Sequence, residues 1–350
     1  MDVRYSPEQE ALRSSAVRIV DRLGPGAVAA LDDTARSGSL GEAVRDSGWL
    51  ALRQGEGPGT PLASGVEVAI VAEELGRGLA DTAFAGPLLA ADLRRRCGAA
   101  PADAVETVVL DPTLCELGTA AAPGGVAIDA QGAGYGLVLV GGDATGVRRL
   151  GRRRLGARSL QLDLTRPTAW VGDGDPVEEV PSRRGLDDED LAAWSALGLA
   201  VTCADLVGVM RGAIALANDY AIGRRQFDVP VGSFQAVQHL LADAHVAMEG
   251  SRSVALHAAW AADALAPHEA LAAAALAKAY CARAARQVCE TSVQVHGGIG
   301  NTWDCLAHVF LRRALLSAEL FGGAEHNVTR VLAYHGVPAG AGAGTGRGLR

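Results

Sequence analysis

Two polar stretches in the C-terminal half of the chain carry residues suited to binding an anionic group. Arg224 follows a long apolar stretch, and a guanidinium at a helix terminus can donate a charge-assisted hydrogen bond to a phosphate. Gly297 and Gly298 lack side chains, which lets a ligand approach the main chain. An arginine that ends a helix is usually a solvated charge, and a Gly-Gly pair is usually a helix stop. Taken alone, each stretch favours this ordinary interpretation.

The elements that hold these residues are long Ala-rich stretches with helical periodicity. They end at Pro or Gly breaks, at residues 229–230, 267 and 297–298. Three acidic residues, 187–189, precede the first stretch, where the positive end of a helix dipole favours them. Four long helices with short loops predict an antiparallel four-helix bundle. We expect helices over residues 192–222, 234–264, 268–294 and 305–332, a bundle domain over residues 186–335, and a disordered tail over residues 336–350.

The first hundred residues also read as a helical domain. The sequence Ser6-Pro7-Glu8-Gln9 is a helix start, because Ser6 can cap, Pro7 suits the first helical position and Gln9 can complete a capping box. This first helix should extend to about Leu23. Apolar periodicity predicts further helices over residues 41–52 and 66–79. We therefore expect an N-terminal helical domain over residues 1–100.

From residue 101 to residue 185 the pattern changes to short β-branched and aliphatic runs between turns. This pattern predicts a small, barrel-like β domain. Six arginines lie between Arg148 and Arg158; a solvated hairpin tip is the ordinary interpretation, and a phosphate-binding loop is the alternative. The fold class is therefore mainly α with a small β domain. The predicted strands are 108–110, 137–140, 160–164 and 169–171.

Composition excludes several classes of function. The chain has 350 residues, a net charge of −8 and 49% hydrophobic residues, enough for a full core and too apolar for a disordered chain. An acidic chain has no field to attract nucleic acid or an anionic membrane, and no run resembles a membrane span or secretory signal. Six cysteines without a CxxC pair predict reduced, buried thiols, and the histidines lack metal-ligand spacing. We expect a cytoplasmic protein without a metal site.

Three passages are distinctive as a set. Residues 221–228 read Ala-Ile-Gly-Arg-Arg-Gln-Phe-Asp, residues 232–239 contain the letters FQAVQH, and residues 294–303 read Gln-Val-His-Gly-Gly-Ile-Gly-Asn-Thr-Trp. Weaker similarities lie at Ser47–Leu50 and Glu73–Gly76. In order and spacing, these passages resemble the motifs of the acyl-CoA dehydrogenase family, which include arginine-x-glutamine-phenylalanine-glycine and QxHGGxGxTW. The resemblance covers most of the chain.

The resemblance implies FAD as the cofactor, an acyl-CoA as the substrate and an electron acceptor that reoxidises the flavin. It also implies a dimer at least, because the family's motif residues reach across an interface to FAD held mainly by the neighbouring subunit. Asp228 stands where the family has glycine. The alternative for the six arginines then becomes CoA recognition. The positions that match contacts to the adenine half and pyrophosphate of FAD are Arg224, Gln226, Phe227, Gln235, Gln294, Gly297 and Gly298.

Both usual positions of the family's catalytic base lack a carboxylate. Desaturation removes an α-proton to a carboxylate while the β-hydrogen leaves as hydride to the flavin. The family carries that carboxylate in a tyrosine-glutamate-glycine-threonine turn, which here reads Leu-Phe-Gly-Gly over residues 320–323. Phenylalanine, or glycine if the alignment shifts by one residue, therefore stands at the position of the base. The other position, early in the first bundle helix, falls near Gly198. The β domain also lacks the family's threonine-glutamate-proline and lysine-tryptophan-isoleucine-threonine segments, so the flavin-ring half of the site reads as degenerate.

Four residues within the chain are alternatives for the base. Asp304 replaces a glutamate of many relatives, although Asp before a helix is ordinarily an N-cap. Glu319 and Glu325 flank the altered turn, where solvated helix-end charges are the ordinary interpretation. His296 beside Gly-Gly is ordinarily a hydrogen-bonding strut. The catalytic residue stays unknown, with Asp304 as the candidate.

The combination resembles the shorter subunit of the heteromeric α2β2 acyl-CoA dehydrogenases of actinobacteria. The resemblance implies a subunit that clamps FAD and supports the assembly, while an unlike partner carries the base, in the desaturation of a bulky acyl-CoA such as a steroid side-chain thioester. Two alternatives remain. One is a self-sufficient homo-oligomeric flavoenzyme that uses Asp304, and the other is a non-catalytic assembly protein of the same fold.

Overall fold

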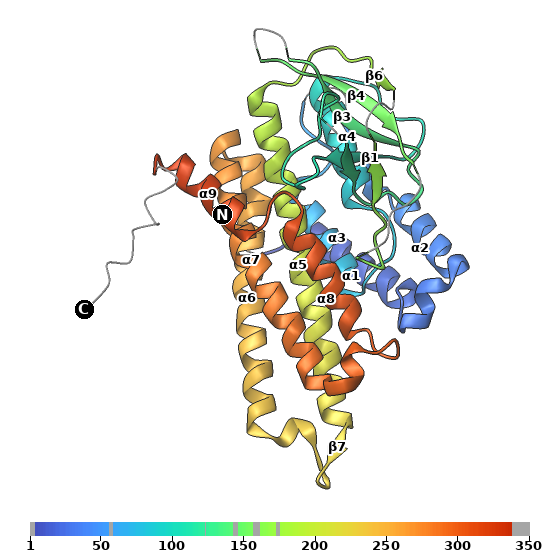
Figure 1. Cartoon of the computed structure of the whole chain (residues 1–350), viewed down its shortest axis with the longest axis vertical. Coiled ribbons are helices and arrows are strands. Elements are labelled where there is room, and N and C mark those ends of the chain that lie inside the picture. The colour runs from blue at the N-terminus through green and yellow to red at the C-terminus, as the bar shows by residue number, and fades with distance from the viewer. Residues whose placement is uncertain are drawn as a thin grey trace, which may run out of the picture.

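The structure is a computed structural model that describes residues 4–55, 59–122, 124–142, 146–156, 162–172 and 176–337. A long helical bundle forms one body, and the N-terminal helices and a curled sheet pack against its upper part (Figure 1). This arrangement matches the predicted class of a mainly α protein with a small β domain. The predicted tail lies outside the described residues from residue 338 onward.

The first N-terminal helix begins with the capping box that its sequence predicts. Ser6 Oγ accepts from the Gln9 N–H at 3.2 Å and the Gln9 side chain accepts from the Ser6 N–H at 3.0 Å, which confirms the capping box. The helix predicted over residues 41–52 ends earlier, at Asp46, because Gly48 turns left-handed at φ 71°. The helices are α1 (Pro7–Leu23), α2 (Thr34–Asp46), α3 (Gly65–Arg77) and α4 (Ala85–Cys97).

A six-stranded mixed sheet follows, in the order β5-β2-β1-β3-β4-β6. The β1–β3 pair is parallel, whereas the other neighbouring pairs are antiparallel. The strand predicted over residues 160–164 is wrong where it is described, since residues 162–164 form bends. The strands are β1 (Glu106–Leu110), β2 (Gly125–Ala127), β3 (Tyr135–Val140), β4 (Arg149–Arg154), β5 (Ala169–Val171) and β6 (Val177–Glu179).

In its described part, the arginine-rich segment forms strand β4 inside the sheet, not the expected hairpin tip, and Arg158 lies outside the described residues. Its charges are compatible with a strand because carboxylates on neighbouring elements pair with them: Arg149 with Glu179 at 2.9 Å, and Arg152 with Glu178 at 2.8 Å. Arg153 is buried and donates to the carbonyl oxygen of Gly172 at 3.1 Å. Cross-strand ion pairs thus account for Arg149 and Arg152, and backbone carbonyl oxygens account for Arg153.

The C-terminal bundle contains the predicted long helices, but the last of them is broken. The helix expected over residues 305–332 is interrupted because Phe321 and Gly322 have φ of 61° and 89°, which no right-handed helix accepts. Asp187 caps the first bundle helix through a capping box, as the acidic start predicted. The helices are α5 (Asp188–Gly223), α6 (Gln235–Ala264), α7 (Pro267–His296), α8 (Ala307–Glu319) and α9 (Ala324–Tyr334).

Helix α5 is the centre of the core. By length and composition it could cross a membrane, so the expectation that no run resembles a membrane span is wrong for this helix. Inside the protein, 78% of its most apolar window is buried, which is typical of a core helix. Five of the six cysteines are buried free thiols, whereas Cys115 is only half-buried. A single large hydrophobic cluster joins the N-terminal helices, one face of the sheet and the bundle.

Candidate functional site

The first motif forms a hairpin at the far end of the bundle. Helix α5 ends at Arg224, whose N–H donates to the Tyr220 carbonyl at 2.8 Å, and strands β7 (Arg225–Gln226) and β8 (Val229–Pro230) follow. Phe227 and Asp228 occupy the hairpin turn with φ of 52° and 64°. Left-handed turn positions favour Gly, Asn or Asp, so Asp228 is a tolerated replacement for the family's glycine.

The second motif lies at the same end of the bundle, where α7 ends. The His296 ring stacks on the Tyr220 ring with centroids 4.6 Å apart, and its Nδ1 lies 2.7 Å from the Ser292 carbonyl oxygen. This hydrogen bond agrees with the strut interpretation of His296. Gly297 has φ of 66° and ends α7, so the helix-stop interpretation is also correct. A Cβ atom on Gly297 or Gly298 would meet no atom within 4 Å, which leaves the main chain open to a ligand.

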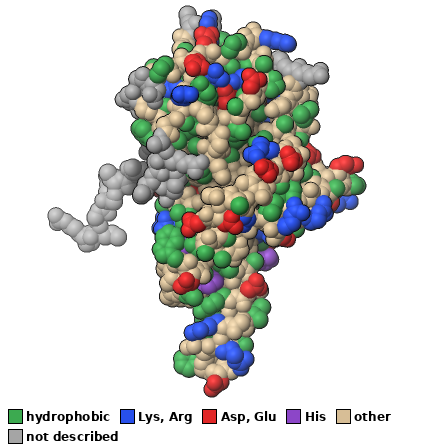
Figure 2. Space-filling view, turned by 90° about the vertical axis from the view of Figure 1, so that its right-hand side faces the viewer, with side chains coloured by type: hydrophobic (Ala, Val, Ile, Leu, Met, Phe, Trp, Pro, Cys, Tyr) green, Lys and Arg blue, Asp and Glu red, His purple; other side chains and the backbone are tan. Residues whose placement is uncertain are grey.

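We call the seven predicted FAD contacts the bundle-end surface, because all seven residues are exposed at this end. Phe227 is 87% exposed and its ring meets Phe234 edge-on at 6.3 Å, so neither ring is the core residue that its type would suggest. Among the described residues, no carboxylate lies within ion-pair distance of the Arg224 guanidinium. Figure 2 shows hydrophobic and charged side chains side by side on the lower tip of the molecule. The bundle-end surface consists of Arg224, Gln226, Phe227, Gln235, Gln294, Gly297 and Gly298.

The two usual base positions meet in the upper part of the bundle. The Phe321 ring is 1% exposed and packs edge-on against Trp194, with centroids 5.5 Å apart. A Cβ atom on Gly198 would lie 2.6 Å from the Phe321 ring, so no side chain fits there unless the ring moves. Hydrocarbon therefore fills the place where a carboxylate would have to lie. We call Gly198, Phe321 and their surroundings the closed centre.

A buried lysine holds the turn that carries Phe321. Lys278 is the only lysine of the sequence and is fully buried. Its Nζ donates to the carbonyl oxygen of Leu320 and lies 3.5 Å from that of Gly322. Burial lowers the pKa of Lys278 to about 8, since no carboxylate pairs with it directly among the described residues.

Buried ion pairs fill the adjoining space between the sheet and the bundle. Asp205 of α5 accepts from Arg313 Nη2 at 2.6 Å, and its other oxygen lies 3.3 Å from Arg166 Nη1. Arg166 Nε also donates to Asp163 at 3.0 Å. Burial alone would raise the pKa of Asp205, but Arg166 and Arg313 hold it below its usual value. We call Asp163, Arg166, Asp205 and Arg313 the ion-pair network.

The space left beside the ion-pair network is small. A cavity of about 20 Å³, lined by Phe84, Thr202 and Phe321 among others, borders Asp205 and Arg166. A volume of that order holds about one water molecule. A tricyclic flavin ring does not fit beside Phe321, so the residues present do not suit the ring half of FAD. The exposed groups of the bundle-end surface do suit its polar adenine and pyrophosphate half.

The remaining base candidates lie elsewhere. Asp304 is exposed and does not cap α8, whose N-cap is Leu306 without a side-chain hydrogen bond, so the N-cap interpretation is wrong. It lies at the start of α8, roughly 20 Å of helix away from the Phe321 turn. Glu319 and Glu325 are exposed helix-end charges, as expected. In the described part of the chain, no group of three or more His, Cys, Asp or Glu side chains could hold a metal ion.

Sequence reasoning missed the ion-pair network and Lys278. A signal was present, because Asp205 is a single carboxylate in the apolar stretch of α5, and Lys278, the only lysine of the sequence, stands in the Ala-rich stretch of α7. A lone charge on an apolar face is buried only if it finds partners. The identity of those partners depends on the tertiary arrangement, which brings Arg166 and Arg313 from segments over a hundred residues apart.

Comparison with known proteins places the chain in a family. Residues 197–334 match the model of the acyl-CoA dehydrogenase C-terminal domain. The acyl-CoA dehydrogenase IpdE2 of Mycobacterium tuberculosis is 30% identical over 327 residues, which cover 89% of this chain and 92% of that protein. FadE27 of the same organism is 34% identical over 160 residues, 44% of this chain, and IpdE2 of Mycolicibacterium smegmatis is 33% identical over 170 residues, 49% of this chain. These two alignments span 43% and 50% of the relatives' own lengths.

Solved structures share the fold along almost the whole chain. A variant of the Tcur3481–Tcur3483 steroid ACAD superposes with a TM-score of 0.77 at 24% identity, covering 94% of this chain and 98% of that one. The ChsE4–ChsE5 complex from Mycobacterium tuberculosis gives a TM-score of 0.76 at 23% identity, covering 97% of this chain and 100% of that one. With a full-length relative at 30% identity, a matching C-terminal domain and this fold, the chain belongs to the acyl-CoA dehydrogenase family of oxidoreductases.

Proposed function

We propose that this chain is one subunit of a heteromeric, FAD-dependent acyl-CoA dehydrogenase, formed as an α2β2 assembly with an unlike partner. It contributes the bundle-end surface to FAD held by the partner, and the partner supplies the catalytic base. The substrate is a bulky acyl-CoA, and a steroid side-chain thioester is the acyl group that we favour. The solved structures of a steroid ACAD and of a two-protein complex support this choice by fold.

The closed centre carries the proposal. A self-sufficient enzyme needs a carboxylate beside the flavin, whereas here Phe321 packs against Gly198 at both usual base positions. The ion-pair network fills the adjoining space, and the exposed bundle-end surface faces away from it. This combination supports a chain that serves a neighbour's cofactor and does not hold the flavin ring itself.

The roles of the residues follow from their chemistry. Bound FAD would accept the β-hydrogen as hydride in the desaturation step. Arg224 would donate charge-assisted hydrogen bonds to the pyrophosphate, and the Gln235 and Gln294 amides would bond polar atoms of the adenine half. Phe227 would offer an exposed ring to the partner. Proton abstraction is assigned to the partner, which leaves this chain with binding and orientation.

The test is co-expression with an unlike acyl-CoA dehydrogenase chain encoded next to it, followed by size-exclusion chromatography with visible absorbance. We expect a yellow heteromer with about one FAD per pair of unlike chains, and a colourless single chain. Turnover of a steroid side-chain CoA thioester by the heteromer alone would support the substrate class. A yellow homo-oligomer of this chain that turns over acyl-CoA would refute the proposal.

A further inference from the structure

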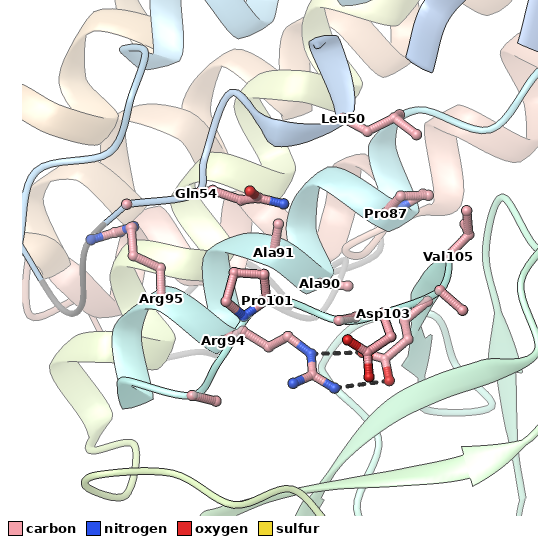
Figure 3. A pocket seen from close by; sticks show the side chains of 15 residues that line it. Leu50, Gln54, Pro87, Ala90, Ala91, Arg94, Arg95, Pro101, Asp103 and Val105 are labelled. Carbon is pink, nitrogen blue, oxygen red and sulfur yellow. Dashed lines mark hydrogen bonds and ion pairs between the residues drawn. The ribbon is translucent and has the colours of Figure 1, made fainter. Parts of the chain in front are cut away.

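A second cavity lies on the opposite side of α4 from the bundle. One side of α4 packs on α5, where Trp194 Nε1 donates to the Leu89 carbonyl at 3.1 Å. The other side, with Pro87 and Ala91, lines a partly open cavity of about 280 Å³, which Leu50 and the segment from Pro101 to Glu106 flank (Figure 3). This cavity shares no lining residue with the closed centre. It is therefore a separate site.

The lining is mostly hydrocarbon with one available amide. Leu50, Pro87, Ala91, Pro101 and Val105 supply apolar walls. Figure 3 shows the Gln54 side chain reaching over α4 toward Ala91. No hydrogen bond of the Gln54 amide occurs within the described part of the chain, so the amide is available to a ligand. Such a lining, with few polar groups among apolar walls, is typical of small-molecule pockets.

Both arginines of the lining are already paired inside the protein, and Asp92, the partner of Arg95, is shared with Arg53 and Arg96. Arg94 donates to Glu106 through Nε at 2.7 Å and through Nη2 at 2.9 Å, and Arg95 Nη2 donates to Asp92 at 2.8 Å. The remaining charge on the lining is the exposed carboxylate of Asp103, which repels anions. A carboxylate or phosphate ligand would have to compete with Glu106 and Asp92 for these guanidinium groups and would be repelled by Asp103, whereas a neutral ligand meets matching apolar walls.

The volume limits the size of the ligand. An apolar protein cavity of about 150 Å³ accepts benzene, so a cavity of 280 Å³ has room for roughly two fused rings. From this volume, the apolar walls and the Gln54 amide, we propose that the cavity between α4 and the β domain binds a neutral, compact, two-ring hydrocarbon that carries a carbonyl or hydroxyl group. The Gln54 amide hydrogen-bonds that oxygen. This site is independent of the desaturation function proposed above.

The test uses the full chain, with α-tetralone as a two-ring ketone and tetralin as the same rings without the oxygen. Isothermal titration calorimetry should show saturable binding of α-tetralone. Ala91→Phe places a ring in the cavity and should weaken binding at least tenfold. Gln54→Leu should weaken binding of α-tetralone about fivefold and leave tetralin unchanged, because only the ketone uses the amide.

Controls separate site occupancy from loss of fold. Ala11→Phe adds the same ring on the exposed surface of α1 and should bind α-tetralone like the parent. If Ala91→Phe misfolds, Gln54→Leu still tests the site, because Gln54 lies in a partly exposed loop where a substitution disturbs the fold less. The anion 1,2,3,4-tetrahydro-1-naphthoate should bind more weakly than α-tetralone. Absence of saturable binding to the parent, unchanged affinity in a folded Ala91→Phe protein, or tighter binding of the anion would each overturn the proposal.

Discussion

The bundle-end surface and the closed centre are built from the same helices, yet they have opposite characters. At the end of α5 and α7, the seven residues of the bundle-end surface, which are predicted to contact FAD, remain exposed. Few of their side chains bond to the rest of the described chain. In the upper part of the bundle, Phe321 and the ion-pair network leave a cavity of only about 20 Å³. One set of helices therefore carries an exposed polar surface at its end and a closely packed core further along.

Energetics explain why the two regions can diverge. Exposed residues such as Phe227 and Arg224 contribute little to the stability of the single chain, so binding alone can retain them. An emptied interior site would instead leave a cavity, whose cost grows with its volume. Filling it with the Phe321 ring against Gly198 removes that cost. The predictions below disturb one region at a time.

The largest expected effect comes from breaking the ion-pair network. Asp205→Ala leaves Arg166 and Arg313 buried without their shared carboxylate, and should lower the free energy of unfolding by about 3–5 kcal/mol. Urea denaturation at pH 7 measures this loss. Because the pKa of Asp205 is held low, the carboxylate stabilises the fold above its unfolded pKa, and this contribution is lost as the pH falls through the lowered value.

The matched control is the exposed pair of Arg286 and Glu290 on α7, 2.8 Å apart. Glu290→Ala should change stability by less than about 0.5 kcal/mol, since a solvated pair contributes little. Equal losses for Asp205→Ala and Glu290→Ala would mean that the closed centre does not depend on its buried charges.

The next effect is the pH dependence contributed by Lys278. An unfolded lysine keeps its proton up to a pH of about 10.4, whereas the folded pKa of Lys278 is about 8. The unfolded state therefore binds more protons between these values, and the stability of the parent relative to Lys278→Met should rise with pH there, by roughly 3 kcal/mol at most. Urea denaturation of both proteins from pH 7 to 10 gives the difference.

A direct titration controls for other groups that ionise in the same range. Because the sequence has one lysine, protein labelled with ¹³C at lysine Cε has a single such NMR signal. Its midpoint should lie near pH 8. A midpoint near the ordinary lysine value would show that the amine reaches solvent, and the closed centre would then be open.

A smaller effect tests the bundle-end surface. In the co-expressed heteromer, Arg224→Ala should weaken FAD retention by about 10- to 100-fold, through loss of a charge-assisted hydrogen bond of roughly 1.5–3 kcal/mol. Equilibrium dialysis with flavin fluorescence measures the affinity. Arg225→Ala is the neighbouring control, because Arg225 Nη2 already donates to the Asp228 carbonyl at 2.5 Å. Equal effects of the two substitutions would remove the specific role of Arg224.

Sequence patterns predicted the elements better than their contacts. Helical period and capping residues located α1, α3 and the long bundle helices, because these signals are local. The arginine-rich strand β4 was misread, since its charges are matched by carboxylates on β6 and on the start of α5, about 25 to 40 residues later in the chain. The break after α8 was missed because Phe321 adopts a left-handed conformation that its residue type does not signal.

The same limit applies to the candidate site, where residue types were predictable and contacts between distant residues were not. The residues of the two motifs were identified from their types and their spacing. The structure places both motifs at one end of the bundle, where α5 and α7 end. Absence of a carboxylate at residues 198 and 321 was readable from the sequence, but their mutual contact was not, because it joins two helices across the core. Asp205 and Lys278 were recognisable as charged residues in apolar stretches, but no pattern in the sequence indicated which residues would pair with them. These contacts join residues that lie far apart in the chain, so local sequence patterns could not predict them.

The smallest expected effect concerns Asp304, which lies outside both regions. Asp304→Asn removes the charge but keeps the shape, and turnover by the heteromer should stay within about twofold of the parent. The proposed function assigns the base to the partner, and this exposed carboxylate lies at the start of α8, roughly 20 Å of helix from the Phe321 turn that matches the family's base position. Steady-state kinetics with bound flavin measured in parallel gives the answer. If turnover disappeared while FAD stayed bound, this chain would carry the base at its bundle end, and the contrast between an outward binding surface and a closed centre would have to be replaced by a single catalytic site at the subunit contact.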